Sequence, residues 1–305
     1  MKIGLLKLEN YINIAIEKIR LYHKLSGDDV EDYNNFNRYD LVYVSKIFSY
    51  TPDYSCNVNS DTVIKGGSGY DVKSCLPSHI ELLKPKINIG FTSRGCIRNC
   101  DFCIVKEKEG DFRITGDIYD FWDGMSDVVT ILDNNILADK IHFKNICQQI
   151  NGEGIPEVDF NQGLDIRLLD EIDIKILKEL NIKTIRFAAD NFAILKVIRE
   201  KIKIITKYIP VSKLFFYVLV GNKFKDLSEN LYTIQYLRNI GCSVFTQVYL
   251  PRDIKEKKSI HHSIFDELAR FGSVHQNRNL TFEMFLKNRN NIFLLKDYYK
   301  NLYGF

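Results

Sequence analysis

Residues 87–103 read INIGFTSRGCIRNCDFC, an apolar run followed at once by a loop that holds three of the chain's seven cysteines. The run 87–92 predicts a β-strand. Cys96, Cys100 and Cys103 follow it with the spacing C-x3-C-x2-C. Thiols crowded into one short loop indicate a site for a metal ion or a metal cluster.

Strand-like and helix-like segments alternate from residue 86 onward. The predicted strands are 87–92, 127–132, 157–161, 183–188, 214–220 and 243–249. The predicted helices lie near 138–151, 169–180, 192–206, 226–239 and 260–270. This alternation predicts a parallel sheet with right-handed crossovers and helices outside. Active sites of such folds lie at the carboxyl ends of the strands, which is where the cysteine loop begins.

The chain on either side of this unit has a different character. Residues 1–85 predict a small α/β unit with a first strand at 3–6, a helix at 11–24, a polar turn at 25–35, a strand within 39–48 and a short strand that runs into a glycine-rich turn within 62–72. Pro77 and Pro85 mark its end. We therefore expect three parts: 1–85, the α/β unit 86–272, and an aromatic-rich helical cap 273–305.

The composition and charge of the chain indicate which classes of protein it resembles. The 305 residues are 45% hydrophobic and 27% charged, as in an ordinary globular protein. The net charge of +3 does not indicate a nucleic-acid partner. The first residues, MKIGLLKLENY, are too short and too polar an apolar run for a signal peptide, and no apolar stretch is long enough to span a bilayer. We expect a cytoplasmic protein without membrane contact, whose cysteines stay reduced.

The spacing of the cysteines bears on the kind of metal site. A structural zinc site needs four ligands, usually as two pairs a dozen or more residues apart. His142 and Cys147 are far along the chain, and no second pair is present. A [4Fe–4S] cluster held by three cysteines leaves one iron open for a substrate or cofactor. The spacing therefore favours a cluster over zinc, and a zinc-stabilised interaction module without catalysis stays the alternative.

The motif RGCIRNCDFC resembles the C-x3-C-x-aromatic-C signature of the radical S-adenosylmethionine (radical SAM) superfamily. The resemblance extends over about 215 residues. It implies a partial (β/α)6 TIM-like barrel preceded by a small, reduced Rossmann-like domain, of the type found ahead of the barrel in cobalamin-dependent members. It also implies that Cys96, Cys100 and Cys103 ligate a [4Fe–4S] cluster whose fourth iron binds SAM, and that an electron donor such as flavodoxin or ferredoxin reduces the cluster. Reductive cleavage of SAM to a 5′-deoxyadenosyl radical and hydrogen abstraction from an unidentified substrate would follow.

The same resemblance suggests which residues bind SAM. Phe102 is expected near the adenine, or else packs beneath the cluster. The second strand of the barrel lacks the family's Gly-Gly-Glu motif and ends in Asp133, Asn134 and Asn135. Their oxygens are able to accept from an ammonium group. The alternative is that Asp-Asn-Asn only forms a turn.

Polar groups at later strand ends complete the candidate set. Asp165 and Arg167 are candidates for the ribose hydroxyls or the carboxylate of SAM, or form a pair that fixes their loop. Asp190 is a further candidate or caps the helix that follows it. Gly221 lies where the family meets adenine. Possible substrate contacts are Asn222, Gln247, Tyr249 and Arg252.

Two further functions depend on the N-terminal part. Cobalamin domains that ligate cobalt with histidine show Asp-x-His-x-x-Gly, whereas the nearest segment here, RLYHKLSG, has Leu21 and Ser26 at the flanking positions. A cobalamin-dependent radical SAM methyltransferase therefore stays a second alternative without this ligand. Methylthiolation is disfavoured because residues 1–85 hold only two cysteines, Cys56 and Cys75. A ferredoxin-like electron carrier would need neither SAM nor so large a barrel.

Overall fold

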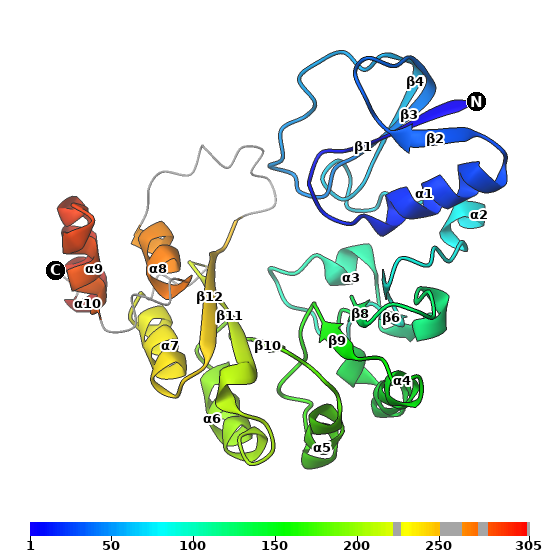
Figure 1. Cartoon of the computed structure of the whole chain (residues 1–305). Helices are drawn as coiled ribbons and strands as arrows, with labels where there is room; N and C mark the ends of the chain where they lie inside the picture. The colour runs from blue at the N-terminus through cyan, green and yellow to red at the C-terminus, as the bar shows by residue number, and fades with distance from the viewer. Residues whose placement is uncertain (222–226, 251–263, 274–279, 304–305) are drawn as a thin grey trace.

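The computed structural model describes residues 1–221, 227–250, 264–273 and 280–303. It is a mixed α/β protein whose sheets are parallel except for one short hairpin. A four-stranded sheet with its helices lies at the N-terminal end, and an arc of strands with helices on its outer side forms the rest (Figure 1).

The N-terminal sheet has the strand order β2-β1-β3-β4, with all neighbours parallel. Its elements are β1 (Lys2–Lys7), α1 (Ile14–Leu25), β2 (Asp29–Asp32), β3 (Tyr39–Ser45), β4 (Ser60–Gly66) and α2 (Ser78–Glu81). Asn13 caps α1 by accepting from the Ile16 amide at 3.2 Å. A core between β1, β3 and the helices contains Ile3, Leu5 and Ile16. Because this core is separate from that of the rest of the chain, the N-terminal unit packs around its own apolar centre.

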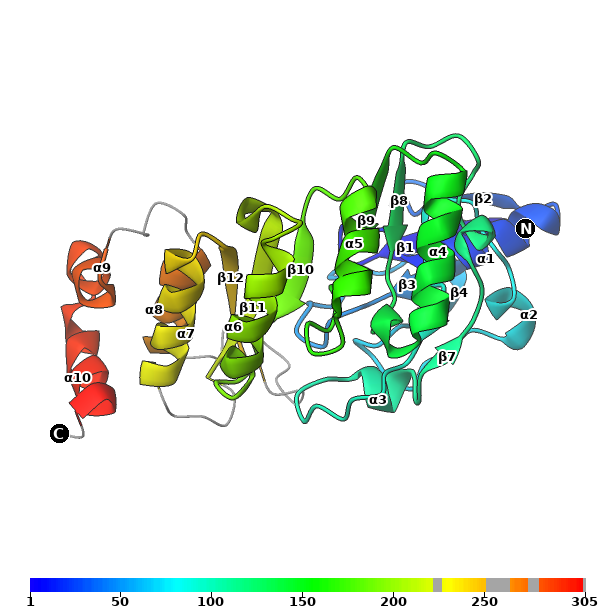
Figure 2. The same ribbon diagram turned by 90° about the horizontal axis from the view of Figure 1, so that it is seen from below.

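Two three-stranded parallel sheets follow, with the orders β5-β8-β9 and β10-β11-β12. Their strands are β5 (Ile89–Gly90), β8 (Val128–Ile131), β9 (Glu157–Phe160), β10 (Ile185–Ala188), β11 (Leu214–Val220) and β12 (Ser243–Val248). The helices α4 (Lys140–Gly152), α5 (Glu171–Glu179), α6 (Ile194–Ile205), α7 (Leu227–Asn239) and α8 (Ile264–Ser273) lie along one side of the strands (Figure 2). The alternation predicted from the sequence is therefore present.

The two sheets meet between β9 and β10. Arg186 of β10 forms an ion pair with Asp159 of β9, and the Leu164 amide donates to the Arg186 carbonyl at 2.8 Å. Gly163 (φ +86°) lets the chain pass close to β10, since a β carbon there would lie 3.0 Å from that carbonyl oxygen. The strands thus follow one another in chain order across both sheets.

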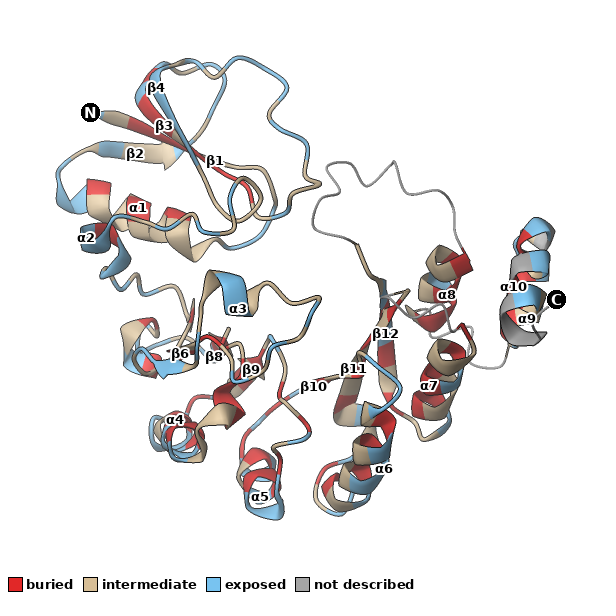
Figure 3. Ribbon diagram, turned by 180° about the vertical axis from the view of Figure 1, so that it is seen from behind, coloured by how far each residue is buried: buried red, intermediate tan, exposed pale blue. Residues whose placement is uncertain are grey.

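The largest apolar core lies between these strands and the helices. Buried residues of α4, among them Phe143, Ile146 and Ile150, recur at helical spacing on the face turned to the strands (Figure 3). The C-terminal helices α9 (Phe282–Asn288) and α10 (Leu295–Tyr303) join the same core through Phe282 and Tyr298. The helical character predicted for the C-terminal part is present within the described residues.

One prediction for the N-terminal part is wrong. Residues 25–35 were expected to form only a polar turn, but β2 lies within them and pairs in parallel with β1. Its residues are DVED, exposed or half-buried, and therefore show no apolar alternation. The strand is held at the edge of the sheet by its backbone hydrogen bonds with β1. The pattern of its side chains therefore does not reveal that it is a strand.

Candidate functional site

A short hairpin closes the cysteine loop at its base. β6 (Ser93–Arg94) pairs antiparallel with β7 (Arg113–Ile114), and α3 (Val105–Lys108) lies between them. The loop leaves β6 through Gly95, whose φ of +79° is a left-handed conformation. A β carbon at Gly95 would lie 2.2 Å from the Asp111 carbonyl oxygen, so only glycine fits where the two ends of the loop pass each other.

The three thiols of the loop are half-buried and free of disulfides. The Arg98 amide donates to the Cys96 sulfur at 3.3 Å, and the Val105 amide donates to the Cys103 sulfur at 3.5 Å. Backbone donors of this kind stabilise negative charge on a cysteine sulfur, as they do around iron–sulfur clusters. The loop is thus wound so that its amides face its own thiols.

Burial raises the pKa of the Cys100 thiol, and the neighbouring Cys103 raises it further, whereas Arg167 lowers it. Metal binding at Cys100 would therefore release a proton. Among the residues that the structure describes, no three His, Cys, Asp or Glu side chains converge as ligands of one metal ion. Three cysteine thiolates are donors of the kind that iron–sulfur clusters use, each on a different iron, so the donor set is compatible with a cluster.

Asn135 follows β8 and lies against the cysteine loop. Its Nδ2 donates to the Cys96 sulfur at 3.5 Å, and its side chain is buried at 3% exposure. The Oδ1 atom is buried and has no hydrogen-bond partner. A buried acceptor without a partner costs free energy unless a ligand supplies a donor. This oxygen is therefore an open acceptor beside a candidate cluster ligand.

Asp133 and Asn134 have other partners. The carboxylate of Asp133 accepts from the Thr92 amide at 2.7 Å and from the Thr92 and Ser93 hydroxyls at 2.6 Å each. Asn134 Oδ1 accepts from the Gly95 amide at 3.0 Å. Both side chains thus tie the end of β8 to the start of the cysteine loop, and of the three candidates only Asn135 has a buried polar atom without a partner.

Burial also shifts the pKa values of Asp133 and His142, which both contact Thr92. It raises the pKa of Asp133, although the hydrogen bonds from Ser93 and Thr92 act in the opposite direction. His142 of α4 lies 2.9 Å from the Thr92 hydroxyl, and burial lowers its pKa. His142, weighed above as a zinc ligand for the cysteine loop, instead contacts Thr92 beside Asp133.

Asp165 joins the segment that follows β9 to the cysteine loop. Arg98, between the first two cysteines, donates to it through Nε at 3.0 Å, and Arg167 donates through Nε and Nη2 at 2.6 and 2.9 Å. Burial alone would raise the pKa of Asp165, but these hydrogen bonds lower it overall. The Asp165–Arg167 pair, expected as one alternative from the sequence, is therefore present. Arg98 was not singled out from the sequence, since a lone arginine in a polar loop carries no specific signal.

Asp190 follows β10 by two residues and is half-buried. Its pKa is raised to about 6, mainly by burial, with Arg167 lowering and Asp165 raising it. The expectation that Asp190 might cap the next helix is wrong, because α6 has Ala193 at its N-cap, and the Ile194 amide is bonded by Asn191. Asp190 is thus a half-buried carboxyl near Arg167 and Asp165.

The remaining candidates differ in their surroundings. Phe102 is half-buried within the cysteine loop. Gly221 ends β11 with φ +77°, and its amide donates to Asn230 at 3.3 Å. Gln247 is exposed and Tyr249 half-buried at the end of β12, while Asn222 and Arg252 lie outside the described residues. Among the four other cysteines, Cys147 and Cys242 are buried in the core, and Cys56 and Cys75 are exposed.

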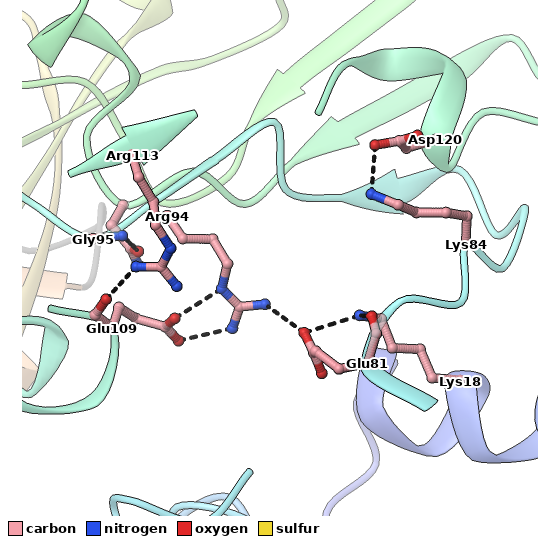
Figure 4. Close-up of polar contacts among 9 residues, drawn as sticks. Lys18, Glu81, Lys84, Arg94, Gly95, Glu109, Arg113 and Asp120 are labelled. Carbon is pink, nitrogen blue, oxygen red and sulfur yellow. Dashed lines mark hydrogen bonds and ion pairs between the residues drawn. The ribbon is translucent and has the colours of Figure 1, made fainter. Parts of the chain in front are cut away.

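The N-terminal unit contacts the cysteine loop through an ionic chain (Figure 4). Arg94 pairs with Glu109, which follows α3, and its Nη1 lies 3.6 Å from Glu81 of α2. Lys18 of α1 pairs with the same Glu81 at 3.0 Å. Nearby, Lys84 pairs with Asp120 at 2.6 Å. Charges from both parts therefore meet at the base of the loop.

His23, the residue nearest to a cobalt-ligand motif, is buried within the N-terminal unit. Its Nδ1 lies 2.6 Å from Asp28, and its Nε2 lies 3.1 Å from the Tyr43 hydroxyl. Both ring nitrogens are thus engaged inside the fold, which leaves neither for a metal.

Comparisons with known proteins give no relative from which a function could be transferred: no family model matches the chain, and no curated protein is similar to it. Within the described residues, no helix is both long and apolar enough to cross a membrane.

Proposed function

We propose that this chain is a radical SAM enzyme that holds a [4Fe–4S] cluster through Cys96, Cys100 and Cys103. The observation that carries the proposal is the pairing of this three-cysteine loop with Asn135, whose amide nitrogen bonds the Cys96 sulfur while its oxygen is buried without a partner. A cluster with three protein ligands leaves one iron open, and an unpartnered acceptor beside it suits a ligand that carries an ammonium group.

The arrangement of strands supports the barrel that this proposal requires. The strands β5, β8, β9, β10, β11 and β12 follow one another in chain order, in two parallel sheets that meet at the Asp159–Arg186 ion pair. We interpret them as a partial (β/α)6 TIM-like barrel, open between its last and first strands. The cysteine loop, Asn135, Asp165 and Asp190 all follow the carboxyl ends of these strands, where barrel enzymes place their sites.

The protein's own residues would bind and orient the cofactors. When bound and reduced, the cluster and SAM supply the radical that takes a hydrogen atom from substrate. Asn135 Oδ1 would accept from the SAM amino group. Arg167 would hold the SAM carboxylate or ribose, with Asp165 fixing its orientation through two hydrogen bonds. Asp133 and Asn134 would act indirectly, by holding the loop.

Other parts have supporting roles in this proposal. Phe102 and Gly221 would lie along the adenine, and Asp190 would contact SAM or substrate. The N-terminal unit, which we interpret as a reduced Rossmann-like domain, would brace the cysteine loop through Glu81 and Arg94. An electron donor such as flavodoxin or ferredoxin would reduce the cluster in the cytoplasm. His23 would not act as a cobalt ligand, because both of its ring nitrogens are engaged.

The test is anaerobic reconstitution with iron and sulfide, followed by reduction with dithionite in the presence of SAM. We expect about four irons per chain, a change in the electron paramagnetic resonance (EPR) spectrum when SAM is added, and 5′-deoxyadenosine detected by mass spectrometry. Cys100→Ala should lose the cluster, whereas Cys56→Ala, at an exposed cysteine between β3 and β4 of the N-terminal unit, should retain it.

Two results would overturn the proposal in distinguishable ways. One zinc per purified chain, with no iron taken up on reconstitution, would indicate a zinc-stabilised interaction module. A four-iron cluster whose EPR spectrum is unchanged by SAM would indicate an electron carrier.

A further inference from the structure

β4 is the outer strand of the N-terminal sheet, and among the described residues it pairs only with β3 (Figure 1). All five of its central residues, 61–65, are exposed. Val63 and Ile64 are 39% and 46% exposed, and residues 60–66 contain no proline. Proteins usually shield a strand edge of this length, because its unpaired backbone groups are ready to pair with another chain.

The ladder shows which backbone groups face outward. The Ser45 carbonyl accepts from Leu8 on the β1 side, and the Lys46 amide donates to the Gly66 carbonyl of β4. Successive residues of a strand direct their backbone groups to opposite sides. Residue 66 therefore faces β3 together with 62 and 64, and the amides and carbonyls of Val63 and Lys65 face the open edge. This alternation does not extend to Asp61, because the Tyr39 amide of β3 donates to the Asn59 carbonyl at 3.1 Å and Tyr39 lies in register with Ser60.

We propose that β4 pairs antiparallel with β4 of a second copy of this chain, about a two-fold axis at Val63. In this register Val63 lies opposite Val63 of the partner subunit, and Asp61 lies opposite the partner's Lys65. Val63 is a hydrogen-bonded position of this antiparallel ladder, so its outward amide and carbonyl pair with those of the partner's Val63. The two four-stranded sheets become one continuous sheet.

Charge complementarity supports this register. Residues opposite each other share one face of a sheet, so the carboxylate of Asp61 meets the ammonium of the partner's Lys65, and the symmetry repeats the pair. Asp61 keeps more than half of its side chain exposed while it pairs with Arg38, and Lys65 lies over the Tyr70 ring at 5.6 Å. A shift of two residues in either direction removes both Asp–Lys pairs. The self-complementary order of charges therefore favours a second copy over an unrelated extended peptide.

The proposal is tested by sedimentation velocity of the reduced full chain at concentrations from about 1 µM to about 300 µM. This range covers the weak association that small interfaces give. The wild type should pass from monomer to dimer within it. Asp61→Lys and Lys65→Asp place like charges opposite each other, so each alone should dimerise about tenfold or more weakly. An equal mixture of the two should restore the dimer, because each lysine then faces an aspartate.

Val63→Pro supplies a second variant. The Val63 amide faces the open edge, so proline there leaves the pairing with β3 intact but blocks the central hydrogen bonds between copies. Arg38→Gln is the matched control, because it removes the ion-pair partner of Asp61 within the chain and leaves the strand edge unchanged. It should dimerise as the wild type does.

Three outcomes would overturn the proposal. They are a wild type that stays monomeric throughout the range, a mixture of the two charge variants that stays monomeric, and a Val63→Pro chain that dimerises like the wild type. Binding of an extended peptide to β4 in a chain that never dimerises would assign the edge to a different partner.

Discussion

Arg94 and Glu109 join the two ends of the cysteine loop: Nε and Nη2 of Arg94 donate to the two carboxylate oxygens of Glu109 at 2.7 and 2.8 Å. The pair is mostly buried, with 23% and 10% of the side chains exposed. The Arg94 guanidinium also lies over the Phe91 ring at 4.3 Å. Burial would raise the pKa of Glu109, but the hydrogen bonds from Arg94 lower it. This two-pronged contact holds the loop closed around the three thiols.

Replacing Arg94 with lysine should therefore open the loop. Lysine keeps the charge but cannot form two parallel hydrogen bonds, so we expect the free energy of unfolding to fall by about 2 kcal/mol. Iron uptake on reconstitution should fall with it. Urea unfolding under reducing conditions and iron analysis measure the two effects.

Arg113→Lys is the matched control for this prediction. Arg113 also donates to Glu109, through the backbone carbonyl, but its side chain is exposed. The free energy of unfolding should stay within about 0.5 kcal/mol of the wild type. Equal losses in both variants would contradict a special role for the two-pronged contact.

Two glycines of the loop share a backbone conformation but not their surroundings. Gly95 and Gly110 have φ values of +79° and +76°. A β carbon at Gly95 would collide with the Asp111 carbonyl, whereas nothing lies within 4 Å of one at Gly110. Gly110→Ala should cost only the strain of the left-handed conformation, about 1–2 kcal/mol.

Gly95→Ala should cost more than Gly110→Ala, since the loop must shift to relieve the collision, and it should also lower iron uptake. Unfolding free energies and iron content of both variants provide the test. Full iron uptake by Gly95→Ala would show that the loop tolerates the shift without loss of the site.

The sequence predicted the alternating elements because their apolar spacing is strong. The buried residues of α6, Leu195, Ile198, Ile202 and Ile205, recur at helical intervals, and β11 alternates buried and half-buried positions. β2 escaped prediction because exposed charged residues at a sheet edge resemble a turn. Its existence depends on the backbone of β1, which is far away in the sequence.

The positions of the candidate site residues could be predicted from the sequence, but their contacts could not. The cysteines and the polar strand ends could be placed by their position along the alternation. Their individual partners could not, because Asp133 meets Thr92 across 41 positions and Asp165 meets Arg98 across 67. Arg94 and Glu109 read as surface charges in the sequence, and only the closed hairpin shows that they are buried together.

Asn135 provides a test specific to SAM. Asn135→Ala removes the unpartnered Oδ1, so on the proposed function we expect SAM to bind the clustered enzyme about tenfold more weakly, the loss of one hydrogen bond to a charged group. Iron content should stay close to that of the wild type. Equilibrium binding of SAM, together with the EPR spectrum of the reduced cluster, measures the effect.

Asn134→Ala is the matched variant for Asn135. Asn134 supports the Gly95 amide instead of presenting an open group, so its loss should lower iron uptake and leave the affinity of the clustered fraction for SAM unchanged. If both variants bound SAM like the wild type, Asn135 would not be a SAM ligand.

Asp190 makes stability depend on pH in a defined direction. Its folded-state pKa of about 6 lies above the ordinary 3.8, so the folded protein binds this proton more tightly than the unfolded chain does. The resulting stability is fully present below pH 3.8 and is lost as the pH rises to about 6. A shift of this size corresponds to about 3 kcal/mol.

Metal-free wild type and Asp190→Asn should therefore be compared by urea unfolding between pH 4 and pH 7.5. The wild type should lose stability relative to the variant up to about pH 6, after which the difference should be constant. Asp165→Asn, compared with the wild type below pH 4, should show the opposite sign, because the pKa of Asp165 is lowered from its ordinary 3.8 and its stabilising contribution is lost only as the pH falls below that value. A difference between the wild type and Asp190→Asn that is independent of pH would mean that Asp190 is solvated in the folded protein, and that its carboxyl is not held in the buried site beside Arg167.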